Sequence, residues 1–303
     1  MSFPLFTSIK PPSNPGELAY LRDCLTSWRA AGFMPVAVNG PCEIKVLRGF
    51  DLPVEFAPLP ADGRPRIGAL LEAIRESGAA VAGIINSDCK IIELSGVADN
   101  LQAGLKGRLA LAWRTDVDGA SYTAMRLGFD AFFFDVSVLP DDDDGFGIGD
   151  TWWDLWFPLA CQAKGAAVEV VKIPLLLHRA HPLNWNWTQW LRNGRRLWSY
   201  LGRPGSPATA DLYGMAEEIP ASLHARPSTL CITGSAELDA TLSAGGRAML
   251  AAAAVERLRR ATAAFFDSRF WRMTAPLRAA VRVVQGGCRR KPSRYNPESL
   301  TTD

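Results

Sequence analysis

Residues 81–88 read Val-Ala-Gly-Ile-Ile-Asn-Ser-Asp, a short apolar run that ends in three polar side chains. Five such residues in a row, followed by turn-forming side chains, predict a buried strand. In an open parallel sheet the carboxyl ends of the strands face the ligand crevice, so Asp88 is placed to hold a metal-bound phosphate. A turn-forming Asn-Ser-Asp cluster without a ligand is the structural alternative.

Strand and helix patterns alternate on both sides of this run. Toward the N-terminus the expected strands cover residues 3–9 and 34–38, and the expected helices cover 17–31 and 67–77. Toward the C-terminus we expect a helix over 94–105, strands over 109–113 and 130–136, a helix over 151–164 and a strand over 167–177. Short strands separated by helices indicate βαβ units. The sequence therefore predicts an α/β fold with a mostly parallel sheet flanked by helices.

The regular alternation fades after residue 202, where prolines, serines and glycines accumulate. We expect a catalytic domain over residues 1–202, a linker over 203–235, a basic helical tail over 236–290 and a disordered C-terminus over 291–303. Between residues 255 and 291 ten arginines and lysines stand against two acids. This C-terminal helical appendage suits a peripheral contact with an anionic membrane. Packing on the catalytic domain or on another subunit is the alternative.

The composition excludes several classes of protein. Hydrophobic residues make up 48% and charged residues 21% of the 303 residues, and the net charge of +2 gives no reason to expect a nucleic-acid partner. The six cysteines include no CxxC pair, which argues against a zinc knuckle or a disulfide framework. We find no signal peptide, no run of about 18 apolar residues and no GxGxxG or P-loop motif. We therefore expect a cytoplasmic enzyme, with the tail as its means of lying against the inner membrane.

The order of the elements has a familiar arrangement: a carboxylate after a central strand, an acidic helix start, and a histidine at the end of a late strand. Over about residues 3–198 it resembles the glycosyltransferases of the GT-A fold. The resemblance implies an enzyme whose Asp-rich motif holds Mn²⁺ or Mg²⁺ on the diphosphate of a nucleotide sugar. The matching residues are Asn86, Ser87 and Asp88, and a late histidine, His178 or His181, would complete the metal shell.

Only the last residue of Asn86-Ser87-Asp88 is acidic, so catalysis without a metal stays open. Asp116-Val117-Asp118 literally spells acid, any residue, acid, but it leads into glycine and serine, and we interpret it as a solvated turn. Arg114, just before it, is placed to face a phosphate or a sugar carboxylate.

The nucleotide site also follows from the resemblance, which places the ends of the first two strands near the base and the ribose. The matching residues are Thr7, Ser8 and Lys10 after the first strand and Asn39 after the second. Small polar groups can reach base edges and hydroxyls, and Lys10 is suited to a phosphate.

A second group of candidate site residues begins at Asp150. In inverting members of the resembled family an acid at a helix start near the acceptor acts as general base, and Asp150 matches that position, with Asp154 as the reserve candidate. A base is needed because the acceptor hydroxyl loses its proton as it attacks the anomeric carbon. The structural alternative makes Asp150 a helix N-cap. Inversion is favoured on the strength of this proposed base.

Seven of the ten tryptophans lie between residues 152 and 198. An indole face covers the apolar C–H face of a sugar ring while its N–H donates to a hydroxyl, so we expect Trp152, Trp153 and Trp185 to line an acceptor site. About half of the seven are expected to be core residues.

Residues 268–278, Ser-Arg-Phe-Trp-Arg-Met-Thr-Ala-Pro-Leu-Arg, resemble an ending found in bacterial enzymes of surface-polysaccharide assembly. The leading hypothesis is therefore a glycosyltransferase that moves a sugar from a nucleotide-sugar donor to a glycan or lipid-linked acceptor in surface-polysaccharide biosynthesis. The alternatives are a non-catalytic GT-A-like protein that binds a glycan or a partner, and a sugar nucleotidyltransferase. Residues 11–16 lack the Gly-rich basic loop that a nucleotidyltransferase usually carries.

Overall fold

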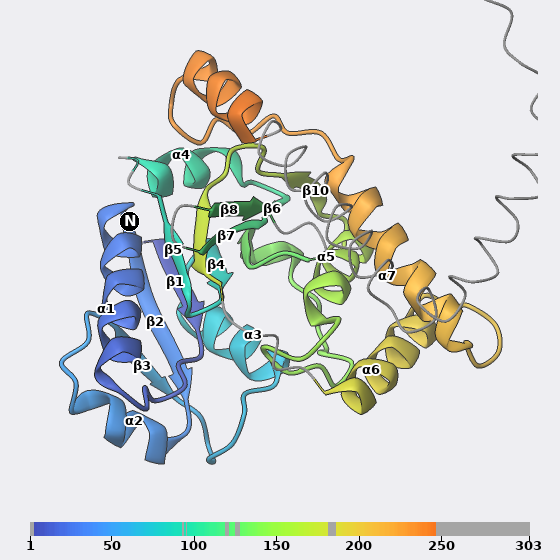
Figure 1. The fold of residues 1–303 in the computed structure, drawn as a ribbon, viewed down its shortest axis with the longest axis horizontal. Helices are drawn as coiled ribbons and strands as arrows, with labels where there is room; N and C mark the ends of the chain where they lie inside the picture. Colours follow the sequence, from blue (N-terminus) through green and yellow to red (C-terminus); the bar gives the residue numbers. More distant parts are fainter. Residues whose placement is uncertain are drawn as a thin grey trace, which may run out of the picture. The chain divides into compact units, whose positions relative to one another are not determined.

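The computed structural model describes residues 3–92, 94, 96–118, 121–124, 128–180 and 186–246. Its main sheet has seven strands in the order β10-β6-β9-β4-β1-β2-β3 (Figure 1). These strands are β1 (Phe3–Thr7), β2 (Phe33–Asn39), β3 (Glu55–Pro58), β4 (Val81–Ile85), β6 (Arg108–Ala112), β9 (Ala131–Asp135) and β10 (Ala167–Val170). All neighbouring pairs are parallel except those of β9, which runs antiparallel to β4 and β6. The expected α/β fold with a mostly parallel sheet is confirmed.

Helices cover both faces of this sheet. They are α1 (Pro15–Ala30), α2 (Pro41–Arg48), α3 (Ile67–Glu76), α4 (Val97–Gly104), α5 (Trp153–Ala163), α6 (Trp187–Tyr200) and α7 (Thr209–His224), with a short 3-10 turn, η1 (Val136–Val138), after β9. One core packs α3, α5, α6 and α7 on one face, and a second core packs α1 and α4 on the other. Alternation along β9 serves both cores, because Phe132 and Phe134 point into the first and Phe133 points into the second.

Close packing requires a glycine in the central strand β4. A Cβ at Gly83 would lie 2.7 Å from Leu5 Cδ1 and 3.0 Å from Phe133 Cδ1. Both neighbours are fully buried, so neither can move aside easily. Gly83 therefore allows β4 to pack between β1 and β9. The residues that follow β4 then lie at the carboxyl edge of the sheet.

A second, smaller sheet has four strands in the order β5-β11-β7-β8. They are β5 (Cys89–Ile91), β11 (Leu176–Arg179), β7 (Arg114–Asp118) and β8 (Ser121–Ala124). Two expectations were wrong here. Residues 116–118 belong to a strand and not to a turn, because β7 pairs with β11, a partner that the local sequence does not reveal. Residues 167–177 form no single strand: β10 ends at Val170 and β11 begins at Leu176, with Pro174 between them.

The residues after 202 contain more regular structure than the expected linker. Helix α7 lies within that segment, and its apolar side chains Leu212, Met215, Ile219 and Leu223 are buried in the first core. Most of the expected basic tail, and all of residues 247–303, lie outside the described part of the chain. Within the described residues no helix combines the length and the apolarity that a membrane span requires.

Candidate active site

The carboxyl edge of the main sheet collects polar side chains from several strands. Thr7 ends β1, Asn39 ends β2, and Asn86 follows β4 directly. Because β9 is antiparallel to its neighbours, the residue before its start, Asp130, lies at the same edge, and the backbone N–H of Asn86 donates to the carbonyl oxygen of Asp130 at 2.9 Å. Groups that are more than 40 residues apart in the sequence therefore meet at one edge.

A first cavity of about 470 Å³ opens at this edge, and we call it the β1 cavity. Six of the eight residues expected to bind the nucleotide sugar line it: Thr7, Ser8, Lys10, Asn86, Ser87 and Asp88. Glu43, Arg64 and Gly149 line it as well, and Arg64 was not expected from the sequence. Lys10 and Arg64 give this cavity two cations, which suits the oxygens of a diphosphate.

Asn39 supports the β1 cavity without lining it. The side chain is fully buried, and its amide donates to the Ile9 carbonyl oxygen at 2.9 Å and to Glu43 at 2.7 Å. Its Oδ1 accepts from the Ile9 backbone N–H at 3.1 Å. The structure thus gives Asn39 a fixed set of protein partners, and these hold the chain segment that leads to Lys10.

A second cavity of about 360 Å³, the tryptophan cavity, adjoins the first because Asn86 and Gly149 line both. It brings together Arg114 and four residues expected to act on the acceptor: Asp150, Trp152, Trp153 and Asp154. Asp130, Trp190 and Gly128 also line it. Trp185 lies outside the described residues.

A charged network links the walls of the two cavities. Arg114 donates to Asp130 Oδ1 through Nη1 at 2.7 Å and to Asp116 Oδ1 through Nε at 2.8 Å. Asn86 Nδ2 donates to the same Asp130 oxygen at 2.7 Å. Burial opposes the charge on Arg114, but the charges of Asp130 and Asp116 outweigh it and raise the pKa of the guanidinium. Arg114 therefore stays a cation and fixes both carboxylates.

The small sheet positions His178. In its register His178 stands opposite Cys89 on one side and opposite Asp116 on the other. His178 Nδ1 lies 2.8 Å from Asp116 Oδ1, and Nε2 lies 3.3 Å from Asp88 Oδ2. Burial alone would lower the pKa of His178, but the hydrogen bonds to Asp116 and Asp88 raise it to about 9. The imidazole thus bridges two carboxylates.

The bridge formed by Asp88, His178 and Asp116 offers some of the ligands that a divalent metal ion requires. Within the described residues no group of three or more His, Cys, Asp or Glu side chains is arranged to hold a metal ion. Asp88 and His178 nevertheless point their ligand atoms at each other, and Asp116 engages the other ring nitrogen, as the outer carboxylate of a metal-binding histidine does. Two protein ligands are enough when substrate phosphates and water fill the other positions. His181 lies outside the described residues.

Asp154 is a carboxyl group with an unusual environment. Burial raises the pKa of Asp154, and the nearby negative charge of Asp130 adds to the effect, so that the pKa reaches about 7. Asp154 Oδ2 accepts one hydrogen bond from the Phe129 backbone N–H at 3.2 Å. A Cβ at Gly128 would lie 2.0 Å from the same oxygen, so only glycine leaves room for this carboxylate. Asp154 can therefore exchange a proton near neutral pH.

Asp150 does not cap α5, contrary to the structural alternative for that residue. The helix begins at Trp153, with Trp152 in the N-cap position. Asp150 instead accepts hydrogen bonds from Arg64 Nη1 at 2.8 Å, from the Gly147 backbone N–H at 2.9 Å and from Gln189 Nε2. These three donors occupy the Asp150 carboxylate, so it does not accept from the first backbone N–H groups of α5 as a cap would.

Trp152 occupies a strained backbone conformation beside the cavity. Its φ of 76° lies in the left-handed region, which a bulky residue adopts at a cost of about 1–3 kcal/mol. The indole Nε1 donates to the Trp190 carbonyl oxygen at 2.9 Å, and the ring packs so closely that a Cβ at Gly194 would lie 3.1 Å from it. Trp152 and Trp153 are only 4% and 3% exposed, so both are core residues that also form the cavity wall.

Three further residues of the two cavities were missed in the sequence: Arg64, Asp130 and Trp190. Asp130 could have been found as the acid immediately before a very apolar strand, once that strand was known to be antiparallel. Arg64 and Trp190 come from a loop and from α6, and no local pattern links either of them to the sheet edge.

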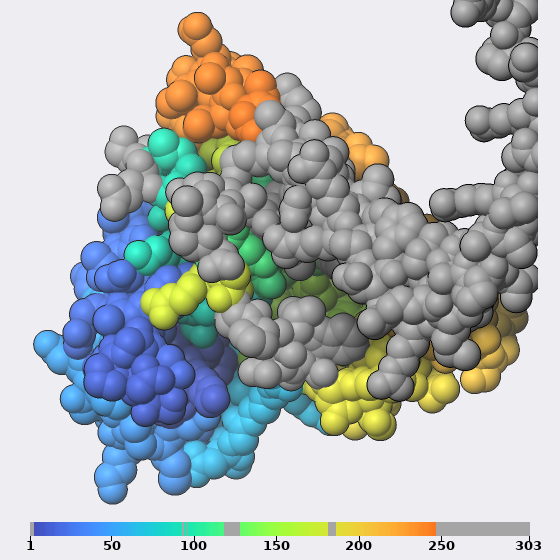
Figure 2. Space-filling view, viewed as in Figure 1, coloured from blue at the N-terminus to red at the C-terminus, as the bar shows by residue number. Residues whose placement is uncertain are grey.

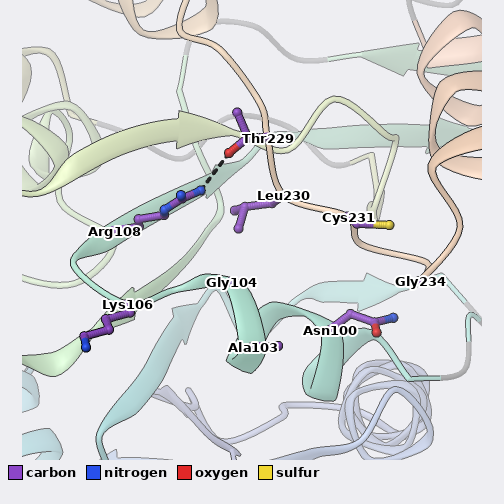
Figure 3. Close-up of a pocket in the computed structure, with 9 residues that line it drawn as sticks. All are labelled: Asn100, Ala103, Gly104, Lys106, Arg108, Thr229, Leu230, Cys231 and Gly234. Atoms are coloured by element: carbon purple, nitrogen blue, oxygen red, sulfur yellow. Dashed lines mark hydrogen bonds between the residues drawn. The ribbon is translucent and has the colours of Figure 1, made fainter.

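A third cavity, of about 660 Å³, lies away from this site, where α4 meets the amino end of β6 (Figure 3). Of the nine residues that line it, only Lys106 and Arg108 carry charge. Arg108 donates to Thr229 Oγ1 at 2.6 Å and to Glu169 at 2.7 Å, so its guanidinium already has protein partners. This cavity offers no acid for proton transfer.

No protein-family model matches the chain, and no curated protein matches it. Among solved structures, the chain is similar to the S. aureus TarS fragment 1–349 in complex with UDP-GlcNAc, with 12% identity, a TM-score of 0.46, and coverage of 74% of this chain and 71% of that one. It is also similar to the mannosyltransferase PcManGT from Pyrobaculum calidifontis in complex with GDP-Man and Mn²⁺, with 12% identity, a TM-score of 0.47, and coverage of 94% and 87%. At these values the likeness concerns the course of the chain alone.

Proposed function

We propose that the protein is a glycosyltransferase that moves a sugar from a nucleotide-sugar donor to a glycan or lipid-linked acceptor. The observation that carries this proposal is the pair of adjoining cavities that share Asn86 and Gly149. One cavity offers cations and Asp88, and the other offers indoles and a carboxyl group with a pKa of about 7. A sugar at the shared wall would meet groups from both.

The donor belongs in the β1 cavity. Thr7, Ser8 and Asn86 supply hydrogen-bonding groups for the base and ribose, and Lys10 and Arg64 supply positive charge for the diphosphate. Asp88 lines this cavity, and together with His178, whose Nε2 lies 3.3 Å from Asp88 Oδ2, it would hold a divalent cation, Mn²⁺ or Mg²⁺, once the imidazole gives up its proton. When bound, such a cation offsets the negative charge that develops on the leaving diphosphate.

The acceptor belongs in the tryptophan cavity, where Asp154 would act as general base. In the transfer step the acceptor oxygen forms a bond to the anomeric carbon, the bond from that carbon to the diphosphate oxygen breaks, and the hydroxyl proton moves to Asp154. A base with a pKa near the working pH suits this proton transfer. A single displacement of this kind inverts the anomeric configuration.

Asp150 takes a different role in this proposal. Its carboxylate holds Arg64 at the shared wall, while Gln189 and the Gly147 backbone occupy its other hydrogen-bonding positions. Asp150 is therefore a positioning residue: it holds the Arg64 guanidinium, which in this proposal binds the diphosphate of the donor. The sequence-based assignment of Asp150 as the base is the competing possibility, and the experiment below separates the two.

The decisive experiment is a panel of nucleotide sugars tested with Mn²⁺ and with EDTA, measured both by thermal shift and by release of nucleoside diphosphate. We expect at least one nucleotide sugar to raise the melting temperature and, with an added glycan or with water as the acceptor of the sugar, to release its nucleoside diphosphate. Asp88→Asn should lose the metal-dependent shift, whereas Asp154→Asn should keep the shift and lose turnover. Loss of turnover in Asp150→Asn but not in Asp154→Asn would move the base to Asp150.

The same panel separates the alternative functions. Binding without turnover in the wild-type protein supports a glycan- or partner-binding protein. Release of pyrophosphate from a nucleoside triphosphate and a sugar 1-phosphate supports a nucleotidyltransferase. No response to any nucleotide sugar rejects the proposal.

The surface-polysaccharide setting rests on residues 268–278, which lie outside the described part of the chain. Membrane contact by the basic tail and the cytoplasmic location stay predictions. Deletion of residues 247–303 should weaken binding to anionic vesicles, and equal binding by the truncated protein would assign the tail to packing.

A further inference from the structure

A fourth cavity, of about 580 Å³, lies against α6 and is lined by three arginines. We call it the arginine pocket, and its lining residues are Asp144, Arg192, Arg195, Arg196, Ser199 and Tyr200. None of these residues lines the β1 cavity or the tryptophan cavity. Figure 2 shows α6, in yellow, at the surface along the lower edge of the face. The arginine pocket is therefore a separate opening, which the proposed transfer does not use.

One side of α6 carries all of the charge of that helix. Arg192, Arg195 and Arg196 are three and four residues apart, so they share one side, and residues 187–200 include no acid. Trp190, on the opposite side of the helix, lines the tryptophan cavity. Like charges at this spacing destabilise a helix, and α6 has no acid to offset them. A bound anion would relieve that repulsion.

Arg196 is held in place by the loop that precedes α5. Its Nη1 donates to the Gly145 carbonyl oxygen at 2.6 Å, and its guanidinium carbon lies 5.5 Å from the centre of the Phe146 ring. A Cβ at Gly145 would lie 3.2 Å from the same guanidinium carbon, and the φ of Gly145 is 74°, so glycine suits this position on both counts. The inner wall of the pocket thus presents a guanidinium of fixed orientation.

The other two arginines keep their donors available. Arg192 and Arg195 are exposed and form no hydrogen bond or ion pair with the part of the chain that the structure describes. Arg64 and Arg203, by contrast, each pair with a carboxylate. A guanidinium presents its donors in a planar fork that matches two oxygens of one phosphate. Two such forks therefore open onto the same cavity.

The charge of the pocket suits a dianion. Among its lining residues, all of them in the described part of the chain, Asp144 is the only acid, so three positive charges and one negative charge leave a net charge of +2. One oxygen of Asp144 already accepts from Trp156 Nε1 at 2.8 Å. Burial and the charge of Asp144 raise the pKa of Tyr200, so its hydroxyl keeps its proton and can donate. A phosphate monoester carries about 1.5 to 2 negative charges near neutral pH, which matches this set of groups.

The size of the pocket and its rim favour a discrete phosphate compound over a flat anionic membrane. A cavity of about 580 Å³ lies within the usual range for small-molecule sites, so it has room for the group to which the phosphate is attached. Asp142 is exposed two residues before Asp144, and an anionic surface that reached the arginines would also meet this acid.

We propose that the arginine pocket binds a phosphate ester, with the phosphate on the guanidinium groups of Arg192, Arg195 and Arg196. The ligand is a phosphate monoester or a diphosphate, carried by a sugar or by a lipid. This goes beyond the proposed function, because binding here requires neither a nucleotide sugar nor turnover.

The experiment titrates inorganic pyrophosphate into the full-length protein by isothermal titration calorimetry, in the presence of EDTA. We expect binding that weakens as the salt concentration rises. Arg192→Gln and Arg195→Gln should each weaken it about 3- to 10-fold, and the double variant about 10- to 100-fold, because each change removes one charge-assisted contact. Both side chains are exposed, so the variants should fold as the wild type does, which circular dichroism checks. The matched control is Arg29→Gln, which removes an exposed arginine of α1 and should leave binding unchanged.

Two results would overturn the pocket: no binding by the wild-type protein, or unchanged binding in the folded double variant. Pyrophosphate can also meet the cations of the β1 cavity, so Lys10→Gln is measured in parallel. Binding that is lost in Lys10→Gln and kept in the double variant would place pyrophosphate in the β1 cavity and reject the arginine pocket.

Further titrations distinguish the sources of the phosphate. Glucose 1-phosphate represents a sugar phosphate, and farnesyl diphosphate represents a lipid-linked one. Binding of either compound that is lost in the double variant supports the pocket and names its source. Vesicles of phosphatidylglycerol form a third arm, and loss of vesicle binding in the double variant with pyrophosphate binding unchanged would make the arginines a membrane contact instead.

The proposed function is tested separately on the same variants. The nucleotide-sugar thermal shift should not change in the double variant, because neither Arg192 nor Arg195 lines the β1 cavity. Absence of that shift in the wild type would reject the proposed function and leave the pocket standing. An intact shift without pyrophosphate binding would reject the pocket alone.

Discussion

Two clusters of buried charge, one at each edge of the main sheet, differ in how they are balanced. At the amino edge Glu169 of β10 is buried and accepts from Arg108 at 2.7 Å, from the Thr229 backbone N–H at 2.7 Å and from Thr229 Oγ1 at 2.9 Å. One acid meets one base, and neighbouring protein groups supply the other bonds. At the carboxyl edge Arg114 and His178 bond to three acids, Asp88, Asp116 and Asp130, and the charge of Asp130 acts on a fourth, Asp154.

This difference separates a structural cluster from a functional one. The amino-edge cluster satisfies its own charges, so its contribution is to stability. At the carboxyl edge the hydrogen bonds to Asp116 and Asp88 raise the pKa of His178 to about 9, and burial, together with the charge of Asp130, raises the pKa of Asp154 to about 7. Shifted pKa values of this kind are typical of sites that bind or transfer charge.

The largest expected effect comes from removing one acid of the carboxyl-edge cluster. Asp154→Asn should lower the rate of sugar transfer about 10²- to 10⁴-fold, because the acceptor hydroxyl loses its base. The donor should still bind, since Asp154 does not line the β1 cavity. Steady-state kinetics on the best nucleotide sugar measures kcat and the donor KM separately. A large rise in the donor KM with kcat unchanged would place Asp154 outside the chemistry.

The matching change at the amino edge should have the opposite profile. Glu169→Gln removes the charge that pairs with Arg108 and offers one acceptor oxygen in place of two, which should cost about 1–3 kcal/mol of unfolding free energy. The transfer rate per folded molecule should not change. Chemical denaturation together with the transfer assay checks both statements. A fall in kcat at full folding would mean that the two edges are coupled.

A pair of glycines offers a finer comparison of the same two edges. A Cβ at Gly128 would lie 2.0 Å from Asp154 Oδ2, and a Cβ at Gly104 would lie 2.6 Å from Leu230 Cδ2. Gly128→Ala should displace the base and slow transfer about 10- to 100-fold, as misplacement of about 1 Å does in other active sites. Gly104→Ala should leave transfer unchanged, because the end of the Leu230 side chain can move. Equal rates in the two variants would show that the position of Asp154 is not critical.

The sequence predicts much of this carboxyl edge because strand ends are local signals. The sequence shows both the apolar run that ends at Asn86 and the polar groups that follow the first strand. The polar residues at these two strand ends line one cavity. Parallel strands necessarily bring such ends together. The placement of these residues therefore followed from the ends of the expected strands.

What the sequence could not predict depends on pairing between distant strands. The register that sets His178 between Cys89 and Asp116 comes from the small sheet, whose members are far apart in the chain. Asp130 joins the site only because β9 is antiparallel. The partners of Asp150 come from a loop and from α6, and they decide that it does not cap a helix. Each of these facts is a tertiary contact, for which hydrophobic periodicity carries no signal.

A further prediction concerns the pH dependence of stability and has a definite sign. The pKa of Asp154 is about 7 in the folded protein and lies at about 3.9 in the unfolded chain, so the unfolded chain loses this proton first as the pH rises. Between about pH 4 and pH 7 Asp154 therefore lowers the stability of the fold progressively, and above about pH 7 its effect is constant. The amide that replaces the carboxyl group in Asp154→Asn does not titrate. The unfolding free energy of this variant relative to wild type should accordingly grow from about pH 4 to about pH 7 and then level off. Urea denaturation at several pH values on both sides of neutrality measures it, and a difference independent of pH would show that Asp154 is not held in a desolvated place.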